Sequence, residues 1–215
     1  GTIHEKKDAT FLKEARFKQM SMDEQKLVRQ VQAGNETAFA ELVRFYKDRI
    51  VNFLFQVTGD YQKAVELSQE TFMRIYFKAK KYRPVAPFSS WVYAIASNLA
   101  RTEMKKMHRF STVSLDEFQN IASAETYPRN PSESSLVRNL REALDSLHPR
   151  YKIPVILKDI EGFSQEEIAQ VLKKPLGTVK ARISRGRGYL KRALEKASSR
   201  KNFFLKNEEF QNGRI

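Results

Sequence analysis

The sequence predicts an all-α protein of two small helical domains joined by a flexible linker, the second domain containing a helix-turn-helix. Through most of the chain, apolar residues recur at intervals of three and four, which places them on one face of a helix. The run from Phe39 to Val57 shows this spacing most clearly. Glycine or proline interrupts the helical runs, as Gly59 does, and no paired alternating segments predict a strand hairpin.

The first domain is expected to span residues 23–107, after a leader at residues 1–22. Beyond the helix that ends near Gly59, a second helix should run from about Tyr61 to Lys80 and a third from about Ser90 to Met107. A basic loop with two prolines separates these two. The second helix is expected to turn five side chains inward: Val65, Phe72, Ile75, Tyr76 and Ala79.

Residues 108–134 show no sustained helical spacing and predict the linker. Helices resume near Ser135, and the second domain should span residues 135–197. Its next helix begins at Pro149 or restarts at Pro154, because proline suits the first turn of a helix but interrupts its interior. Residues 198–215 form a tail rich in aromatic residues, for which we expect fraying, with docking as the alternative.

Composition narrows the functional classes. The 215-residue chain carries a formal net charge of +14 and has a pI of about 9.9, so its field attracts nucleic acid first and acidic membrane surfaces second. Cysteine is absent, and the three histidines lack metal-ligand spacing, so we expect no metal, cofactor or disulfide. No apolar run of membrane-spanning length and no secretory signal pattern occur, which predicts a cytoplasmic protein.

The segment from Glu161 to Leu194 predicts a helix-turn-helix. Ser164 and Glu167 form an S-x-x-E capping box that begins the first helix, and Pro175 suits the start of the second. At 100° per residue, the second helix buries Leu176, Val179, Ile183, Leu190 and Leu194. Its outward side then carries small and basic residues: Thr178, Ala181, Arg185, Gly188 and Arg192, with Arg182 and Ser184 beside them.

Small residues allow close approach to base edges, and arginine binds guanine or phosphate, so this outward side is suited to the major groove of DNA. A solvated basic face is the alternative interpretation of such a charge run. The capping box, the turn and the outward geometry are independent signals that agree, and together they favour DNA binding.

The predicted helix from Ser90 to Met107 carries a second candidate surface. Outside its apolar face, Ala94, Asn98, Arg101 and Lys105 form a stripe edged by Trp91 and Thr102. Tyr82 and Phe88 lie among lysines and arginine just upstream. Aromatic residues interleaved with cations are typical of single-stranded DNA binding, and an asparagine amide can contact a base edge. Residues such as Phe88 and Trp91 are more often core residues than stacking platforms, so the residues alone favour the core and leave base contact as the alternative.

Four stretches, in their order and spacing, resemble a bacterial RNA polymerase sigma factor of the extracytoplasmic-function (ECF) group. The resemblance covers about residues 23–195 and rests on AGNETAFAELVRFYKDRIVNF, SQETFMRIYFKAKKY, FSSWVYAIASNLARTEMKK and LHPRYKIPVILKDIEGFSQEEIAQVLKKPLGTVKARISRGRGYLKRAL. It implies that the first domain binds the polymerase clamp, melts the −10 promoter element and captures its non-template strand. The second domain would contact the −35 element as duplex.

The resemblance also assigns residues to these roles. Core polymerase binding falls to Glu66, Gln69, Glu70, Phe72 and Arg74. Contact with the −10 element falls to Phe88, Trp91, Asn98, Arg101, Thr102 and Lys105. Contact with the −35 element falls to Thr178, Lys180, Arg182, Ser184 and Arg185. Lys63 departs from the family, which often has an acid there. The implied partners are core RNA polymerase, promoter DNA and an anti-sigma factor that no residue identifies.

Two other classes of function fit the sequence less well. A dimeric helix-turn-helix regulator would bind a palindromic operator, but the first domain has no use in such a protein. An enzyme acting on nucleic acid would need a phosphate loop, a metal cluster or an activated nucleophile, and none is recognisable. Glu66 and Glu70 could suggest a metal pair, although carboxylates at this spacing more often form a solvated or partner-binding face. We therefore expect no catalytic residues.

Overall fold

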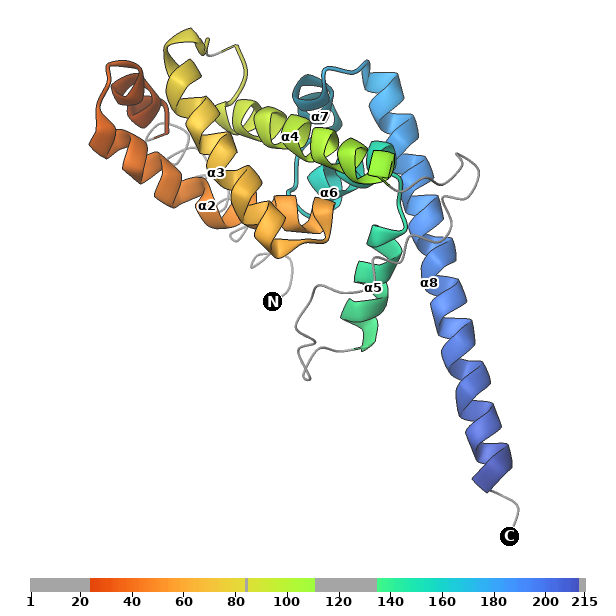
Figure 1. Ribbon diagram of the computed structural model, residues 1–215. Coiled ribbons are helices and arrows are strands. Elements are labelled where there is room, and N and C mark those ends of the chain that lie inside the picture. The colour runs from red at the N-terminus through yellow and green to blue at the C-terminus, as the bar shows by residue number, and fades with distance from the viewer. Residues whose placement is uncertain (1–23, 84, 111–134, 213–215) are drawn as a thin grey trace, which may run out of the picture.

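The computed structural model describes residues 24–83, 85–110 and 135–212, and within these ranges it contains helices and no strand. The all-α prediction is thus confirmed for the described part of the chain. The predicted leader, residues 111–134 of the predicted linker and residues 213–215 lie outside the described ranges. Figure 1 shows one group of helices formed by α2, α3 and α4 and a second formed by α5 to α8.

The first group begins with a helical segment at residues 24–32, followed by α2 (Glu36–Thr58) and α3 (Tyr61–Lys78). Asn35 and Asp60 cap the two helices, because their side chains accept hydrogen bonds from backbone N–H groups that have no partner within the helix. Gly59 adopts a left-handed conformation, φ 77°, and ends α2 as predicted. A short 3₁₀ helix, η1 (Ala79–Lys81), completes α3.

The helix α4 (Phe88–Phe110) begins two residues earlier than predicted and continues through the first three residues of the predicted linker. It packs against both α2 and α3. Tyr76 on α3 differs from its prediction, because its side chain is exposed and its ring lies against Phe39 instead of inside the core.

The second group contains α5 (Ser135–Asp145), α6 (Pro149–Asp159), α7 (Gln165–Leu172) and α8 (Leu176–Asn212). The start of α6 is settled in favour of Pro149, since His148 caps the helix there and Pro154 lies inside it. The helix α8 continues well beyond the helix-turn-helix, and Figure 1 shows its second half projecting away from the other helices.

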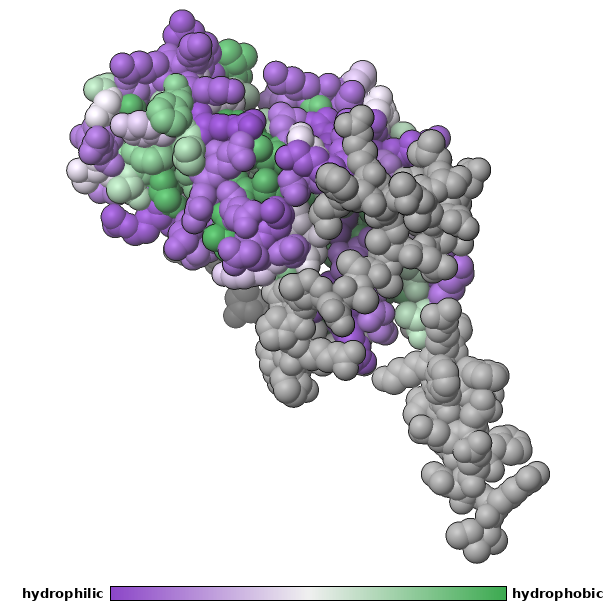
Figure 2. Space-filling model, in the orientation of Figure 1, coloured by the Kyte–Doolittle hydropathy of each residue, from purple (hydrophilic) through white to green (hydrophobic). Residues whose placement is uncertain are grey.

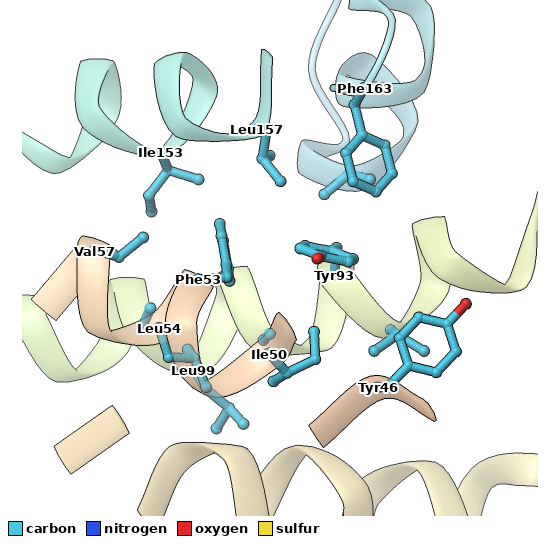
Figure 3. Close-up of a cluster of buried hydrophobic side chains, with 14 of the residues drawn as sticks. Tyr46, Ile50, Phe53, Leu54, Val57, Tyr93, Leu99, Ile153, Leu157 and Phe163 are labelled. Atoms are coloured by element: carbon cyan, nitrogen blue, oxygen red, sulfur yellow. The ribbon is translucent and has the colours of Figure 1, made fainter. Parts of the chain in front are cut away.

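A single buried cluster joins the two groups. Figure 3 shows Ile153, Leu157 and Phe163 of the second group facing Val57, Phe53 and Tyr93 of the first. All six side chains are buried. The sequence analysis gave no sign of this shared core, which only the structure shows.

A buried ion pair lies at the edge of this junction. The Nζ atom of Lys152 on α6 lies 2.8 Å from Oδ1 of Asp145 at the end of α5, and the Lys152 side chain is only 2% exposed. Oδ1 of Asp145 also lies 3.5 Å from the position that a Cβ atom would take at Gly59. Burial lowers the pKa of Lys152, and the neighbouring Asp145 opposes this shift.

Candidate nucleic-acid interface

The helix-turn-helix has the local structure that the sequence predicted. The Ser164 hydroxyl accepts from the Glu167 backbone N–H, with N and Oγ 3.1 Å apart, and the Ser164 N–H donates to the Glu167 carboxylate. This reciprocal pair is the predicted capping box. The turn uses Lys173 in a left-handed conformation, φ 50°, where glycine is the more common residue.

The burial pattern of α8 confirms which of its sides faces outward. Val179 and Ile183 are buried, and both belong to the core. The predicted −35 residues lie on the other side of this part of the helix. Lys180, Ser184 and Arg185 are exposed, whereas Thr178 and Arg182 are partly buried. The exposed side therefore offers two cations and a hydroxyl to a ligand.

Two contacts hold α8 at close range to α6 and were missed from the sequence. A Cβ atom at Gly186 would lie 2.6 Å from Cγ2 of Val155, so only glycine allows this approach. Arg187 donates to the Asp159 carboxylate at the end of α6, with Nε and Oδ2 3.0 Å apart. The sequence analysis did not single out Gly186, because a lone glycine in a helix does not show which neighbouring helix lies against it.

The second candidate surface is the polar stripe of α4. Asn98, Thr102 and Lys105 are exposed, and Arg101 is partly buried. A guanidinium nitrogen of Arg101 donates to the side-chain oxygen of Asn98, which orients the Asn98 amide. The Asn98 side chain still has its amide N–H groups as donors for a base edge.

The aromatic residues at the start of α4 form one cluster. The rings of Tyr82 and Trp91 are 5.0 Å apart between centroids, and those of Phe88 and Trp91 are 5.5 Å apart. Phe88 is only 4% exposed and Trp91 is partly buried. In this structure Phe88 is therefore a core residue with almost no surface for a base, because it fills the space between Tyr82, Trp91 and Tyr46.

A glutamine far away in sequence holds the loop before this cluster. Nε2 of Gln32 donates to the backbone oxygens of Ala79 and Tyr82, each at 3.0 Å. The Tyr82 hydroxyl donates to the backbone oxygen of Ala86 at 2.8 Å. These hydrogen bonds position the basic loop. The residues around Gln32 in the sequence form no pattern that would predict this role.

The predicted partner-binding residues of α3 fall on two sides of the helix. Glu66, Gln69, Glu70 and Arg74 are exposed, whereas Phe72 is 7% exposed and packs in the core. Glu66 pairs with Lys63 and Glu70 with Arg74, both at 2.6 Å, so each carboxylate has a neighbouring cation. Nζ of Lys63, the residue that differs from the family pattern, also lies 3.9 Å from Oε1 of Glu103. This ion pair links α3 to α4.

Large apolar side chains are exposed beside these charges. Met73 is 59% exposed and Phe77, one turn further along α3, is 75% exposed. Figure 2 shows polar residues over most of the coloured part of the visible face, with apolar groups in scattered patches between them. The sequence analysis did not single out Met73 or Phe77, since their exposure depends on which side of α3 meets the core.

Two buried tyrosines each hydrogen-bond to a glutamate. Tyr46 donates to Glu24 within the first group of helices, and Tyr93 donates across the junction to Glu161. Burial raises the pKa of both carboxyl groups, whereas the tyrosine hydroxyls and the positive charge of Arg49 oppose that shift. Burial and the adjacent carboxylates also raise the pKa of both tyrosines, so both are neutral donors near pH 7.

Two other kinds of site are absent from the described residues. Among the residues that the structure describes, no three histidine, aspartate or glutamate side chains are grouped so that they could hold a metal ion. None of the described helices is both long enough and apolar enough to span a bilayer.

Comparison with known families matches both groups of helices. The family model for sigma-70 region 2 matches residues 42–110, and that for sigma-70 region 4 matches residues 138–196. These two ranges contain all the α3, α4 and α8 residues singled out above and together cover more than half of the chain.

Individual relatives of the chain belong to the same family as these two models. The chain is 38% identical over 163 residues to the ECF RNA polymerase sigma factor SigE of Mycolicibacterium smegmatis, a match covering 74% of this chain and 62% of the relative. It is 32% identical over 184 residues to the ECF RNA polymerase sigma factor SigW of Bacillus subtilis, covering 81% of this chain and 98% of that one. The chain thus spans less than two thirds of the first relative and nearly all of the second.

Two solved structures share the fold. CnrH, solved with the cytosolic domain of CnrY, superposes with a TM-score of 0.61 at 22% identity, covering 81% of this chain and 98% of that one. The sigma factor RpoE of Bartonella quintana, solved with the anti-sigma factor NepR, gives a TM-score of 0.58 at 23% identity, covering 73% and 96%. Fold, surfaces and relatives agree: the chain belongs to the sigma-70 family of transcription initiation factors and, within it, to the ECF group.

Proposed function

We propose that this chain is a sigma factor that binds core RNA polymerase, directs it to promoters with particular −10 and −35 elements, and supports promoter melting. One observation carries the proposal. A helix-turn-helix with an exposed basic side and a separate helical unit with an exposed polar stripe occur in one chain, in the order of sigma-70 regions 2 and 4. An operator-binding regulator would not need the first unit.

The exposed side of α8 would contact the −35 element in the major groove. Arg185 and Lys180 have the charge and exposure to bind guanine or phosphate, and Ser184 is short enough to let the backbone approach the bases. Arg182 and Thr178 would contribute from the edge of this surface. A well-placed bidentate pair discriminates against a wrong base by about 1–3 kcal/mol.

The polar stripe of α4 would hold the unpaired −10 strand. Asn98 and Thr102 offer groups for base edges, while Arg101 and Lys105 supply positive charge for the backbone. Trp91 retains partial exposure and could stack on a base. We assign Phe88 an indirect role, since it supports the ring of Trp91 from the core.

The exposed side of α3 would bind core polymerase. Glu66, Gln69, Glu70 and Arg74 form its polar part, and the buried Phe72 keeps that side of the helix in place from below. In this scheme, the chain supplies binding energy and positioning and performs no chemical step. We therefore propose no catalytic residue and no cofactor, and action in the cytoplasm, where polymerase and promoters are found. An anti-sigma factor is a further proposed partner.

The test is run-off transcription with purified bacterial core polymerase on promoter fragments, with and without this protein. Start-site-specific transcripts that require the protein are expected. Arg185→Ala should reduce transcription most on promoters with an intact −35 element. Arg187→Ala is the matched control, because this arginine lies on the same helix but is paired with Asp159.

The competing function has a distinct outcome. Absence of polymerase binding, together with protection of a palindromic duplex by the protein alone, would favour the dimeric regulator and contradict the sigma-factor proposal.

A further inference from the structure

We propose that Gln32 is a positioning residue for capture of the unpaired −10 strand. It holds the basic loop that follows α3 (residues 79–83) so that Trp91 and the cations of the loop meet the strand in a fixed arrangement. The role in strand capture rests on the proposed function, whereas the positioning rests only on contacts within this chain. Gln32 lies outside residues 42–110, the range that matches the sigma-70 region 2 model.

The end of α3 needs hydrogen-bond donors from elsewhere in the chain. Carbonyl groups at the end of a helix have no partner within it, and α3 gives way at Ala79 to the short helix η1. Nε2 of Gln32 donates to the backbone oxygens of Ala79 and Tyr82, each at 3.0 Å. A side-chain amide has two N–H donors, one for each oxygen. Lys80 and Lys81 lie between the two anchored residues, so this one side chain fixes both ends of the stretch that carries them.

Gln32 is itself held at a defined place. It is the last residue of the helical segment at residues 24–32, which is too short to be stable alone. Val28 and Val31 of this segment are buried and anchor it in the core. Gly34, with φ 89°, turns the chain directly afterwards, and its N–H donates to the Val31 oxygen at 3.0 Å. The amide of Gln32 therefore reaches the basic loop from a fixed base.

Tyr82 transmits this positioning to Trp91. The two ring centroids lie 5.0 Å apart, with the ring planes inclined by 36°, and Phe88 lies 5.3 Å from the Tyr82 ring on its other contact. The Tyr82 hydroxyl donates to the Ala86 oxygen at 2.8 Å. Burial and the nearby Glu24 carboxylate raise the pKa of Tyr82, so this hydroxyl is a neutral donor near pH 7. A shift of the Tyr82 backbone would therefore move the ring that lies against Trp91.

The groups held in this way suit a single strand of nucleic acid. Lys80, Lys81 and Arg83 are exposed, and Trp91 keeps part of its ring accessible. Cations that follow the phosphates and a ring that stacks on a base must be correctly spaced to bind the same strand. A loop that was ordered only on binding would lose affinity to the entropy of ordering. The Gln32 contact orders the loop beforehand.

The first experiment tests the positioning in the free chain. Trp91 is the only tryptophan, so its fluorescence reports on this site alone. Gln32→Glu keeps the size of the side chain but replaces its N–H donors with a carboxylate, which the two carbonyl oxygens repel. Gln25→Glu is the matched control, since it adds the same charge at an exposed position of the same helical segment.

Gln32→Glu should make Trp91 more accessible to quenching by acrylamide and shift its emission to longer wavelength. Gln25→Glu should change neither property. Gln32→Lys should behave as wild type, because its ammonium group again donates to the carbonyl oxygens. Unchanged Trp91 fluorescence in Gln32→Glu, or equal changes in Gln32→Glu and Gln32→Lys, would overturn the positioning role. Circular dichroism checks that each variant keeps its helices.

The second experiment measures open-complex formation by the full chain with core polymerase, using permanganate reactivity of the −10 region. Gln32→Glu should slow this step about three- to tenfold, the effect of losing roughly one net hydrogen bond. Its affinity for core polymerase should equal that of wild type, and Gln32→Lys should restore the rate. Equal loss of polymerase affinity and of open-complex formation would mean general damage to the first group of helices and would contradict the proposal.

These readouts separate the two proposals. If wild-type protein binds no polymerase and forms no open complex, the sigma-factor proposal fails, and the fluorescence of the free chain still decides whether Gln32 positions the loop. If the fluorescence changes as expected but Gln32→Glu forms open complexes at the wild-type rate, the role of Gln32 in strand capture is refuted while the sigma-factor proposal stands.

Discussion

The buried ion pair between Lys152 and Asp145 allows a quantitative test of the electrostatics at the junction. Replacing Asp145 with asparagine keeps the size of the side chain but removes its charge. The ammonium group of Lys152 would then be almost fully buried without a counter-charge. Breaking such a pair from one side typically costs about 3–5 kcal/mol, and we expect about 3 because asparagine still accepts a hydrogen bond.

The loss of stability in Asp145→Asn has an upper limit that depends on pH. Lys152 can lose its proton, and the loss cannot exceed the free energy of that deprotonation. From an ordinary pKa of 10.5, deprotonation at pH 7 costs about 4.8 kcal/mol, and at pH 9 only about 2 kcal/mol. Burial lowers the pKa of Lys152 in the folded chain, so between that lowered value and 10.5 the unfolded chain binds more protons. The stability of Asp145→Asn should therefore rise with pH relative to wild type.

The measurement is urea unfolding followed by helical circular dichroism at pH 7 and pH 9. Lys152→Met is the control, since it removes the buried charge at similar volume and leaves Asp145 partly hydrated; we expect a change within about 1 kcal/mol. The double variant should resemble Lys152→Met and regain most of the lost stability. A loss for Asp145→Asn below about 1 kcal/mol at pH 7, or one just as large at pH 9, would refute this reasoning.

Three further predictions concern other sites. Burial raises the pKa of Glu161, so the folded chain holds this proton more tightly than the unfolded chain; the stability that Glu161 contributes should rise as pH falls toward its ordinary pKa of 4.5, and Glu161→Gln should weaken that trend in urea unfolding. Gly186→Ala forces a methyl against Val155 and should cost about 1–3 kcal/mol in urea unfolding, whereas a gain would mean that helix propensity dominates. Asn98→Ala should slow open-complex formation about tenfold at unchanged polymerase affinity, and equal loss of both would make Asn98 structural.

The parts of the fold that depend on local signals were predictable from the sequence. The capping box at Ser164, the break at Gly59 and the inward positions Val179 and Ile183 each follow from a few neighbouring residues. The same is true of the basic outward side of α8, because a helix has only one side left once its apolar residues are buried.

Features that depend on distant contacts could not be predicted. Phe88 could fill the core or contact a base, and only its burial in the structure distinguishes the two roles. Tyr93 gave no signal as a junction residue, because its partner Glu161 is 68 positions away. Pro154 illustrates the same limit, since a helix can pass through a proline when its surroundings hold it in place.

The core shared by the two groups of helices has a consequence for solubility. If the groups separated, Phe53, Tyr93, Ile153, Leu157 and Phe163 would be exposed to solvent on two surfaces, each an apolar patch prone to aggregation. Each group therefore covers the apolar surface of the other. A polar substitution at one of these five positions is expected to lower the solubility of the chain as well as its stability.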